Sequence, residues 1–165
     1  MKAVDRWEYE GKEVKSIWLP KKNFEEISPI TQVYGVVFNK DNEILIARSD
    51  DEWIIPGGTP EEDDNSLIAT LKRELWEEVR VKIKNQWPIG YCKVLYPAGE
   101  EEPDVSYQVR YACLVDEIHE IGPDPDTGKI FERKFIGPEE FTKYVEWGEM
   151  GREMIKEAVE TIEKE

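Results

Sequence analysis

The stretch that decides the fold runs from Trp53 to Val81 and reads WIIPGGTPEEDDNSLIATLKRELWEEVRV. A Pro-Gly-Gly turn at Pro56–Gly58 opens it, and a loop rich in carboxylates follows. Paired glycines let bare backbone come close to a ligand or a metal ion. The run from Ser66 to about Val79 then predicts a helix, because Asn65 or Ser66 can cap it and neither Gly nor Pro interrupts it.

The predicted helix carries three glutamates on one face. Its leucines form a buried stripe at helical spacing, and Glu74, Glu77 and Glu78 fall beside this stripe rather than opposite it. Like charges at such spacing destabilise a helix by roughly 0.2–0.5 kcal/mol per pair. A hard divalent cation such as Mg²⁺ would reverse the sign, because it binds carboxylate oxygens. Taken alone, the helix is better explained as an ordinary solvated acidic face, because Glu is a good helix former and is abundant in this chain.

Outward from this stretch, the chain alternates strands with a few helices. Strands are predicted at Ile30–Phe38, Glu43–Arg48, Ile89–Leu95, Tyr107–Val115 and Ile130–Ile136. Further helices are predicted from Pro138 to about Trp147 and from Met150 to about Glu163. This pattern predicts a mixed sheet covered by helices on two faces. We expect a single domain over residues 1–165, with residues 1–29 as an N-terminal arm and residues 148–165 holding the C-terminal helix.

Composition limits the partners. The chain has 37 acidic and 22 basic residues and a net charge of −15, which argues against a nucleic-acid polymer as partner. A small phosphorylated substrate stays compatible if a cation offsets the repulsion. There is no run of 18 apolar residues and no secretion signal, so we expect no membrane partner. The only cysteines, Cys92 and Cys113, are expected to be buried and reduced in a cytoplasmic protein.

The central stretch resembles the signature of the Nudix hydrolases, G-x5-E-x7-R-E-U-x-E-E-x-G-U with U aliphatic. Its core is complete as Arg73–Glu78 (RELWEE), within a Nudix box that spans Gly58–Val81. The loop carries one extra residue, so the loop glutamate of the signature falls on Asp64 or Asn65. Arg80 replaces the terminal glycine, and we expect this to cost the helix about 1 kcal/mol of capping.

The resemblance implies a fold and an activity. The fold is α/β (α+β), an α/β/α sandwich with a mixed β-sheet. The activity is that of a pyrophosphohydrolase with Mg²⁺ or Mn²⁺ as cofactor, in which water attacks phosphorus in a nucleoside diphosphate linked to another moiety.

The resemblance also implies roles for the box residues. Glu77 and Glu78 would bind the metal, with the Gly58 carbonyl as a further ligand. Glu74 would be a third ligand or the base, and Arg73 would orient the glutamates by ion pairing.

Outside the box, Glu132 is the candidate carboxylate that binds metal or activates water, because it lies at a loop–strand junction in a Glu-x-x-aromatic pattern that the family also has. The run Glu100–Glu102 competes for this role. Candidates to stack on a base are Tyr34, Trp53 and Tyr96, and candidates to bind phosphate oxygens are Arg48, Arg110 and Arg133.

Several alternatives stay open. A non-catalytic nucleotide- or metabolite-binding module on the same fold is the alternative function. An isoprenyl-diphosphate isomerase would need a catalytic cysteine motif that the sequence lacks. The substrate can be ADP-ribose-like, a nucleoside triphosphate or a dinucleotide, and the sequence leaves open whether the chain works alone or as a homodimer.

Overall fold

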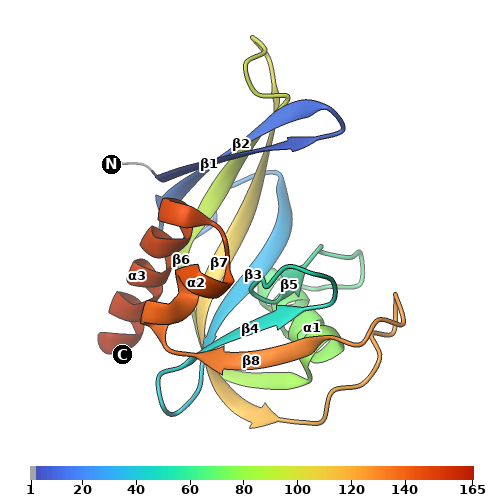
Figure 1. Ribbon diagram of the computed structural model, residues 1–165, viewed down its shortest axis with the longest axis vertical. Coiled ribbons are helices and arrows are strands. Elements are labelled where there is room, and N and C mark those ends of the chain that lie inside the picture. The colour runs from blue at the N-terminus through green and yellow to red at the C-terminus, as the bar shows by residue number, and fades with distance from the viewer. Residues whose placement is uncertain (1–2) are drawn as a thin grey trace.

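The computed structural model describes residues 3–165, which form one curled sheet with helices on both sides (Figure 1). The strands are β1 (Ala3–Tyr9), β2 (Lys12–Pro20), β3 (Ile30–Phe38), β4 (Ile44–Arg48), β5 (Gly57–Gly58), β6 (Val81–Tyr96), β7 (Asp104–Ile118) and β8 (Glu132–Ile136). They lie in the order β1-β2-β6-β7-β3-β4-β8, with β5 paired to β3. The β3–β7 pair is parallel and the other pairs are antiparallel, so the sheet is mixed as predicted.

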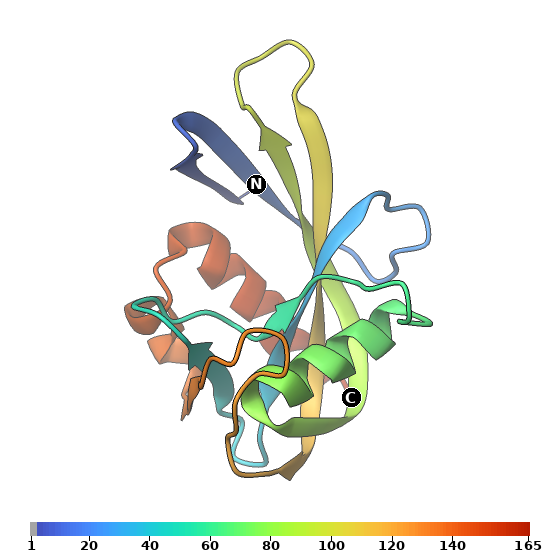
Figure 2. The same cartoon turned by 90° about the vertical axis from the view of Figure 1, so that its right-hand side faces the viewer.

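Helices cover the two faces of the sheet. Figure 2 shows α1 (Leu67–Val79) on one side and α3 (Gly148–Glu163) on the other, with the short η1 (Pro138–Glu140) and α2 (Phe141–Tyr144) on the α3 side. Strand β3 serves both cores, because successive side chains of a strand point to opposite faces. Val33 and Val37 pack in the cluster that contains the α1 leucines, and Val36 and Phe38 in the cluster that contains the α3 side chains. The predicted α/β/α sandwich is confirmed.

Both ends of α1 follow from local chemistry. Ser66 caps the start, its side-chain oxygen accepting a hydrogen bond from the Ala69 backbone N–H at 3.1 Å. Arg80 ends the helix in the left-handed conformation that glycine adopts without strain, with φ 53° and ψ 44°. Its backbone N–H donates to the carbonyls of Leu75 and Trp76. The helix therefore ends where the sequence predicts, although a residue with a side chain takes the strained position.

Strand β7 is longer than predicted by three residues at each end, strand β8 starts two residues later than predicted, and three further regions differ more. The N-terminal arm is a regular hairpin of β1 and β2 that joins the sheet through β6, and its residues 1–2 lie outside the described residues. Strand β6 starts at Val81, directly after the helix, where single lysines alternate with apolar side chains. The segment 138–147 is broken rather than one helix, because Val145 turns to an extended conformation with its side chain fully buried. Within residues 3–165, no helix is long and apolar enough to cross a membrane.

Candidate functional site

The candidate site is a cavity of about 430 Å³ between α1, β5 and the loop that precedes β8. The charged residues in its lining are five carboxylates and one lysine: Glu61, Glu74, Glu78, Asp124, Asp126 and Lys129. Two of the five carboxylates are the helix glutamates Glu74 and Glu78, and Gly58 lines the same cavity. The structure thus brings together residues that the sequence placed in one site.

Glu78 is the most buried of the box glutamates, with 9% of the residue exposed. Its Oε1 accepts a hydrogen bond of 3.0 Å from the Gly57 backbone N–H. Burial raises the pKa of Glu78 to about 8 and that of Glu74 to about 7, and it raises the pKa of Glu77 as well. Burial in low dielectric disfavours the charged carboxylate, and the neighbouring acids add to the effect. A cation bound beside these three buried glutamates would stabilise their charged form.

Arg73 is the cation that offsets part of this charge. Its guanidinium donates to the Thr59 carbonyl at 2.9 Å. It also forms ion pairs with four carboxylates: Glu61 at 2.7 Å, Asp64 at 2.9 Å, Glu74 at 2.9 Å and Glu77 at 3.3 Å. Glu78 lies outside this set. One guanidinium therefore orients two of the three box glutamates and ties the loop to the helix.

Asp64, rather than Asn65, faces this arginine. Its carboxylate also accepts hydrogen bonds from the Thr70 hydroxyl at 2.8 Å and the Glu61 backbone N–H at 2.9 Å. The Arg73 guanidinium holds the pKa of Asp64 well below its usual range. Asp64 thus stands six residues after Gly58, at the loop-acid position of the signature, and the extra residue falls between Asp64 and Arg73.

The first glycine of the turn is required by a close backbone contact, because a Cβ atom on Gly57 would lie 2.2 Å from the Val33 carbonyl oxygen. A Cβ on Gly58 would lie 2.3 Å from the Glu74 carboxyl carbon, so a side chain there would displace the Glu74 carboxylate from its position. Bare backbone is therefore what lets β5 pair with β3 and approach the helix glutamates. This is the close approach that the paired glycines predicted.

Asp124 and Asp126 are the candidate site residues that sequence reasoning missed. Together with Glu77, each offers one carboxylate oxygen, and the three oxygens lie within 4.8 Å of one another. Asp124 is only 7% exposed and accepts the Asp126 backbone N–H at 2.8 Å. The sequence shows this segment only as a long turn. The chain folds back and brings the Asp124–Asp126 segment beside α1. This is a contact between segments far apart in the sequence, so a local sequence pattern does not predict it.

Glu132 lies elsewhere. It is the exposed first residue of β8, and its carboxylate pairs with the Arg48 guanidinium at 3.1 Å. It is not among the residues that line the glutamate cavity. The competing run Glu100–Glu102 is exposed in the loop between β6 and β7, which Figure 1 shows at the tip of the molecule beyond β1 and β2.

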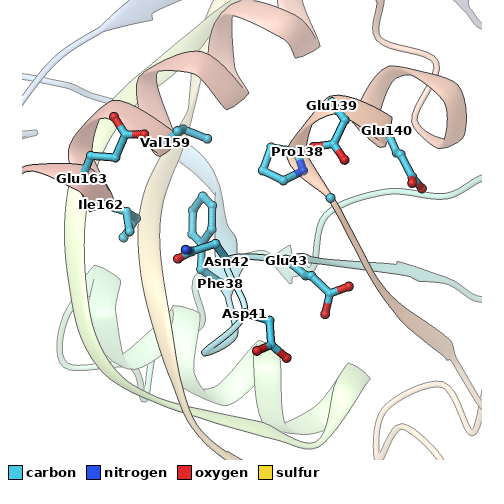
Figure 3. Close-up of a pocket in the computed structure, with 11 residues that line it drawn as sticks. Phe38, Asp41, Asn42, Glu43, Pro138, Glu139, Glu140, Val159, Ile162 and Glu163 are labelled. Atoms are coloured by element: carbon cyan, nitrogen blue, oxygen red, sulfur yellow. The ribbon is translucent and has the colours of Figure 1, made fainter.

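A second and larger cavity, of about 610 Å³, lies between the β3–β4 turn, η1 and the end of α3 (Figure 3). Its apolar wall includes Phe38, Val159 and Ile162. The charged residues in its lining are all acidic: Asp41, Glu43, Glu139, Glu140 and Glu163. Because this lining offers no positive group to a phosphorylated ligand and no box residue, the α1 cavity is the candidate site.

Comparison with known families agrees with this geometry. A family model described as the NUDIX domain matches residues 29–157. The chain belongs to the Nudix family. This assignment confirms the resemblance seen in the sequence and the enzyme class that it implied, a hydrolase acting on phosphoric anhydride bonds.

Solved structures show the same Nudix fold at low sequence identity. The pyrophosphohydrolase BsRppH of Bacillus subtilis, solved as a mutant, aligns with a TM-score of 0.63 and 17% identity over 95% of this Nudix chain and 97% of that chain. MutT from Aliivibrio salmonicida and Vibrio cholerae aligns with a TM-score of 0.57 and 18% identity, over 81% of this chain and 98% of that chain. A MutT protein of Bacillus halodurans aligns with a TM-score of 0.56 and 19% identity, over 76% of this chain and 78% of that chain.

Proposed function

We propose that this Nudix hydrolase is a Mg²⁺- or Mn²⁺-dependent pyrophosphohydrolase that cleaves a nucleoside diphosphate linked to another moiety. One observation carries the proposal: buried carboxylates from α1 meet those of the loop before β8 around a single cavity. Carboxylates crowded in this way repel one another, and a bound divalent cation would make their closeness favourable.

The donor set fits the proposed metal. All of the side-chain donors are carboxylate oxygens, which Mg²⁺ and Mn²⁺ prefer. Glu77, Glu78 and the Gly58 carbonyl are the proposed ligands, with Glu74 as a further ligand or base. Asp124 and Asp126, whose carboxylates lie close to that of Glu77, are additional candidate ligands. When bound, the metal would neutralise the pyrophosphate charge and lower the pKa of a water molecule.

The chain's own residues contribute positioning and proton transfer. Arg73 holds Glu74 and Glu77 in place through its ion pairs. The Gly57 N–H holds Glu78. The pKa of Glu74, raised by burial to about 7, suits a group that takes up a proton near neutral pH. A carboxylate outside α1 is also needed to bind metal or activate water. Glu132 stays the prediction from the sequence for this role, whereas the position of Asp124 in the glutamate cavity supports Asp124.

The metal is tested by Glu78→Gln, which keeps the shape of the side chain and removes its charge. In wild-type protein, Mg²⁺ at a hundred times its Kd should stabilise the fold by about 2.7 kcal/mol, because it binds the native state. The variant should lose most of this gain and most turnover. Thermal unfolding with EDTA and with Mg²⁺, beside turnover of nucleoside diphosphate derivatives, triphosphates and dinucleotides, measures both.

Glu160→Gln is the matched control, since Glu160 is an exposed helical glutamate on α3. It should respond to Mg²⁺ as the wild-type protein does. A Glu78→Gln protein with an undiminished metal response would exclude Glu78 as a ligand. Wild-type protein that binds metal and nucleotide without turnover would support the non-catalytic binding module instead. A cytoplasmic location stays a prediction from the sequence, and the sequence leaves the choice between monomer and homodimer open.

A further inference from the structure

Arg110 of β7 is a buried cation without an acidic partner. It is 3% exposed, and within residues 3–165 no carboxylate oxygen lies within 4.0 Å of its guanidinium. Its Nη1 donates to the Gln108 carbonyl at 2.9 Å, whereas its buried Nε has no hydrogen-bond partner. An unpartnered buried donor destabilises the fold, so its presence points to a partner that arrives with a ligand.

The surroundings of Arg110 define which donors are left. The guanidinium carbon lies 4.6 Å from the centroid of the Tyr34 ring and 5.9 Å from that of Trp147. With Nη1 engaged by the backbone, the pair of N–H groups on Nε and Nη2 remains. These two donors point the same way in the plane of the guanidinium, so they match a group that presents two adjacent acceptors.

Arg110 lines a cavity of about 580 Å³, which also contains the Ser16 hydroxyl and the rings of Tyr34 and Trp147. This volume lies within the range of small-molecule sites. Tyr34, which lines this cavity, pairs in the sheet with Gly57, which lines the glutamate cavity and whose N–H donates to Glu78. A ligand could therefore place one end here and its pyrophosphate at the glutamates.

The charge of the lining limits the ligand. Besides Arg110 and Arg6, the charged residues in the lining are acidic: Asp5, Glu8, Glu52 and Glu146. These carboxylates disfavour an anion and favour a neutral ring that carries N–H donors as well as acceptors. Guanine is such a ring: it presents O6 and N7 as adjacent acceptors, whereas adenine presents a donor beside N7.

We propose that this cavity binds the guanine base of the substrate, with the Arg110 Nε and Nη2 groups donating to O6 and N7. The inference rests on the proposed function for the pyrophosphate end of the ligand. It adds the substrate class: guanosine derivatives rather than adenosine derivatives.

The experiment measures nucleoside binding in EDTA, by calorimetry and Trp fluorescence, so neither metal nor turnover is needed. Guanosine should bind about 5- to 150-fold more tightly than adenosine, the range expected for one bidentate base contact. With the wild-type protein, 7-deazaguanosine, which lacks the N7 acceptor, should lose most of this preference. Arg110→Lys keeps the positive charge but removes the paired N–H donors of the guanidinium, so it should abolish the preference for guanosine over adenosine.

Arg152→Lys, at an exposed site on α3, is the matched control and should keep the preference. Equal binding of guanosine and adenosine would overturn the proposal, as would a preference that survives both Arg110→Lys and 7-deazaguanosine. Tight binding of inorganic phosphate that Arg110→Lys abolishes would assign the paired N–H donors to an anion instead. If Arg110→Lys fails to fold, the 7-deazaguanosine comparison decides. Guanosine preference without Mg²⁺-dependent turnover would contradict the proposed function alone, and turnover without base preference would contradict this inference alone.

Discussion

Arg73 sets the charge balance of the site at the scale of single residues. One guanidinium meets four carboxylates, so the cluster keeps a negative excess even before Glu78, Asp124 and Asp126 are counted. Such an excess is unfavourable in the isolated protein and favourable once a divalent cation is bound. Under the proposed function, this excess would lower the stability of the metal-free fold and favour binding of the cation.

The variants Asp124→Asn and Glu132→Gln test which carboxylate outside α1 binds metal or activates water. Asp124→Asn keeps the side-chain oxygen that accepts the Asp126 N–H and removes only the charge. We expect it to lower kcat by about 10²–10⁴-fold, the range for loss of a group that assists proton transfer. Glu132→Gln should change kcat less than about tenfold, because the exposed Glu132 carboxylate pairs with Arg48 outside the cavity.

Steady-state kinetics of the two variants under saturating Mg²⁺ make this comparison, with circular dichroism to confirm that both fold. The reverse result, a large loss of kcat for Glu132→Gln and a small one for Asp124→Asn, would return the role to Glu132. It would also require β8 to move relative to α1 during turnover.

At the scale of elements, Arg80 joins the end of α1 to the loop that carries Asp124. Its backbone takes the left-handed conformation that caps the helix, and its Nη2 donates to the Pro123 carbonyl at 2.7 Å. The guanidinium carbon of Arg80 also lies over the Trp76 ring, 5.3 Å from the ring centroid. The arginine thus adds a contact to the loop that a glycine could not make, in return for backbone strain.

These two effects separate in a pair of variants. Arg80→Ala and Arg80→Gly both remove the contact with Pro123, but only glycine adopts the left-handed conformation without strain. We expect Arg80→Gly to be more stable than Arg80→Ala by about 1 kcal/mol in chemical unfolding. Equal stabilities would mean that the helix end rearranges in the variants and that its left-handed residue carries no strain.

The elements that could be predicted from the sequence are those with a strong local period. Strand β3 and helix α1 match their predicted ranges to within a residue, and α3 begins two residues early. Segment 138–147 could not be predicted, because the buried Val145 breaks a helix that local propensity favours. The site divides in the same way. The α1 glutamates follow from spacing on one helix, whereas Asp124 reaches them through a tertiary contact between distant segments.

At the scale of the whole molecule, the glutamate cavity and the proposed base site are linked through the pairing of β3 with β5. Successive residues of β3 serve opposite faces, so Val33 packs toward α1 while Tyr34 lies toward α3. The two glycines of β5 pair with these residues and bring the α1 glutamates to the same edge. In the proposed complex, the pyrophosphate would lie at the α1 glutamates and the base in the cavity lined by Tyr34 and Arg110.

The buried glutamates should also set the pH dependence of the whole fold. The pKa values of Glu74 and Glu78 are raised by burial from 4.5 to about 7 and about 8. Between pH 4.5 and 8 the native state therefore holds protons that the unfolded state has lost, so the free energy of unfolding in EDTA should fall as the pH rises through this window. Urea unfolding at several pH values measures the slope. Glu78→Gln should flatten it, and Mg²⁺ should restore stability most at the alkaline end, because fewer protons compete for the carboxylates. A stability in EDTA that stays constant across this window would show that the glutamates are solvated with ordinary pKa values, and would remove the electrostatic reason for a cation at α1.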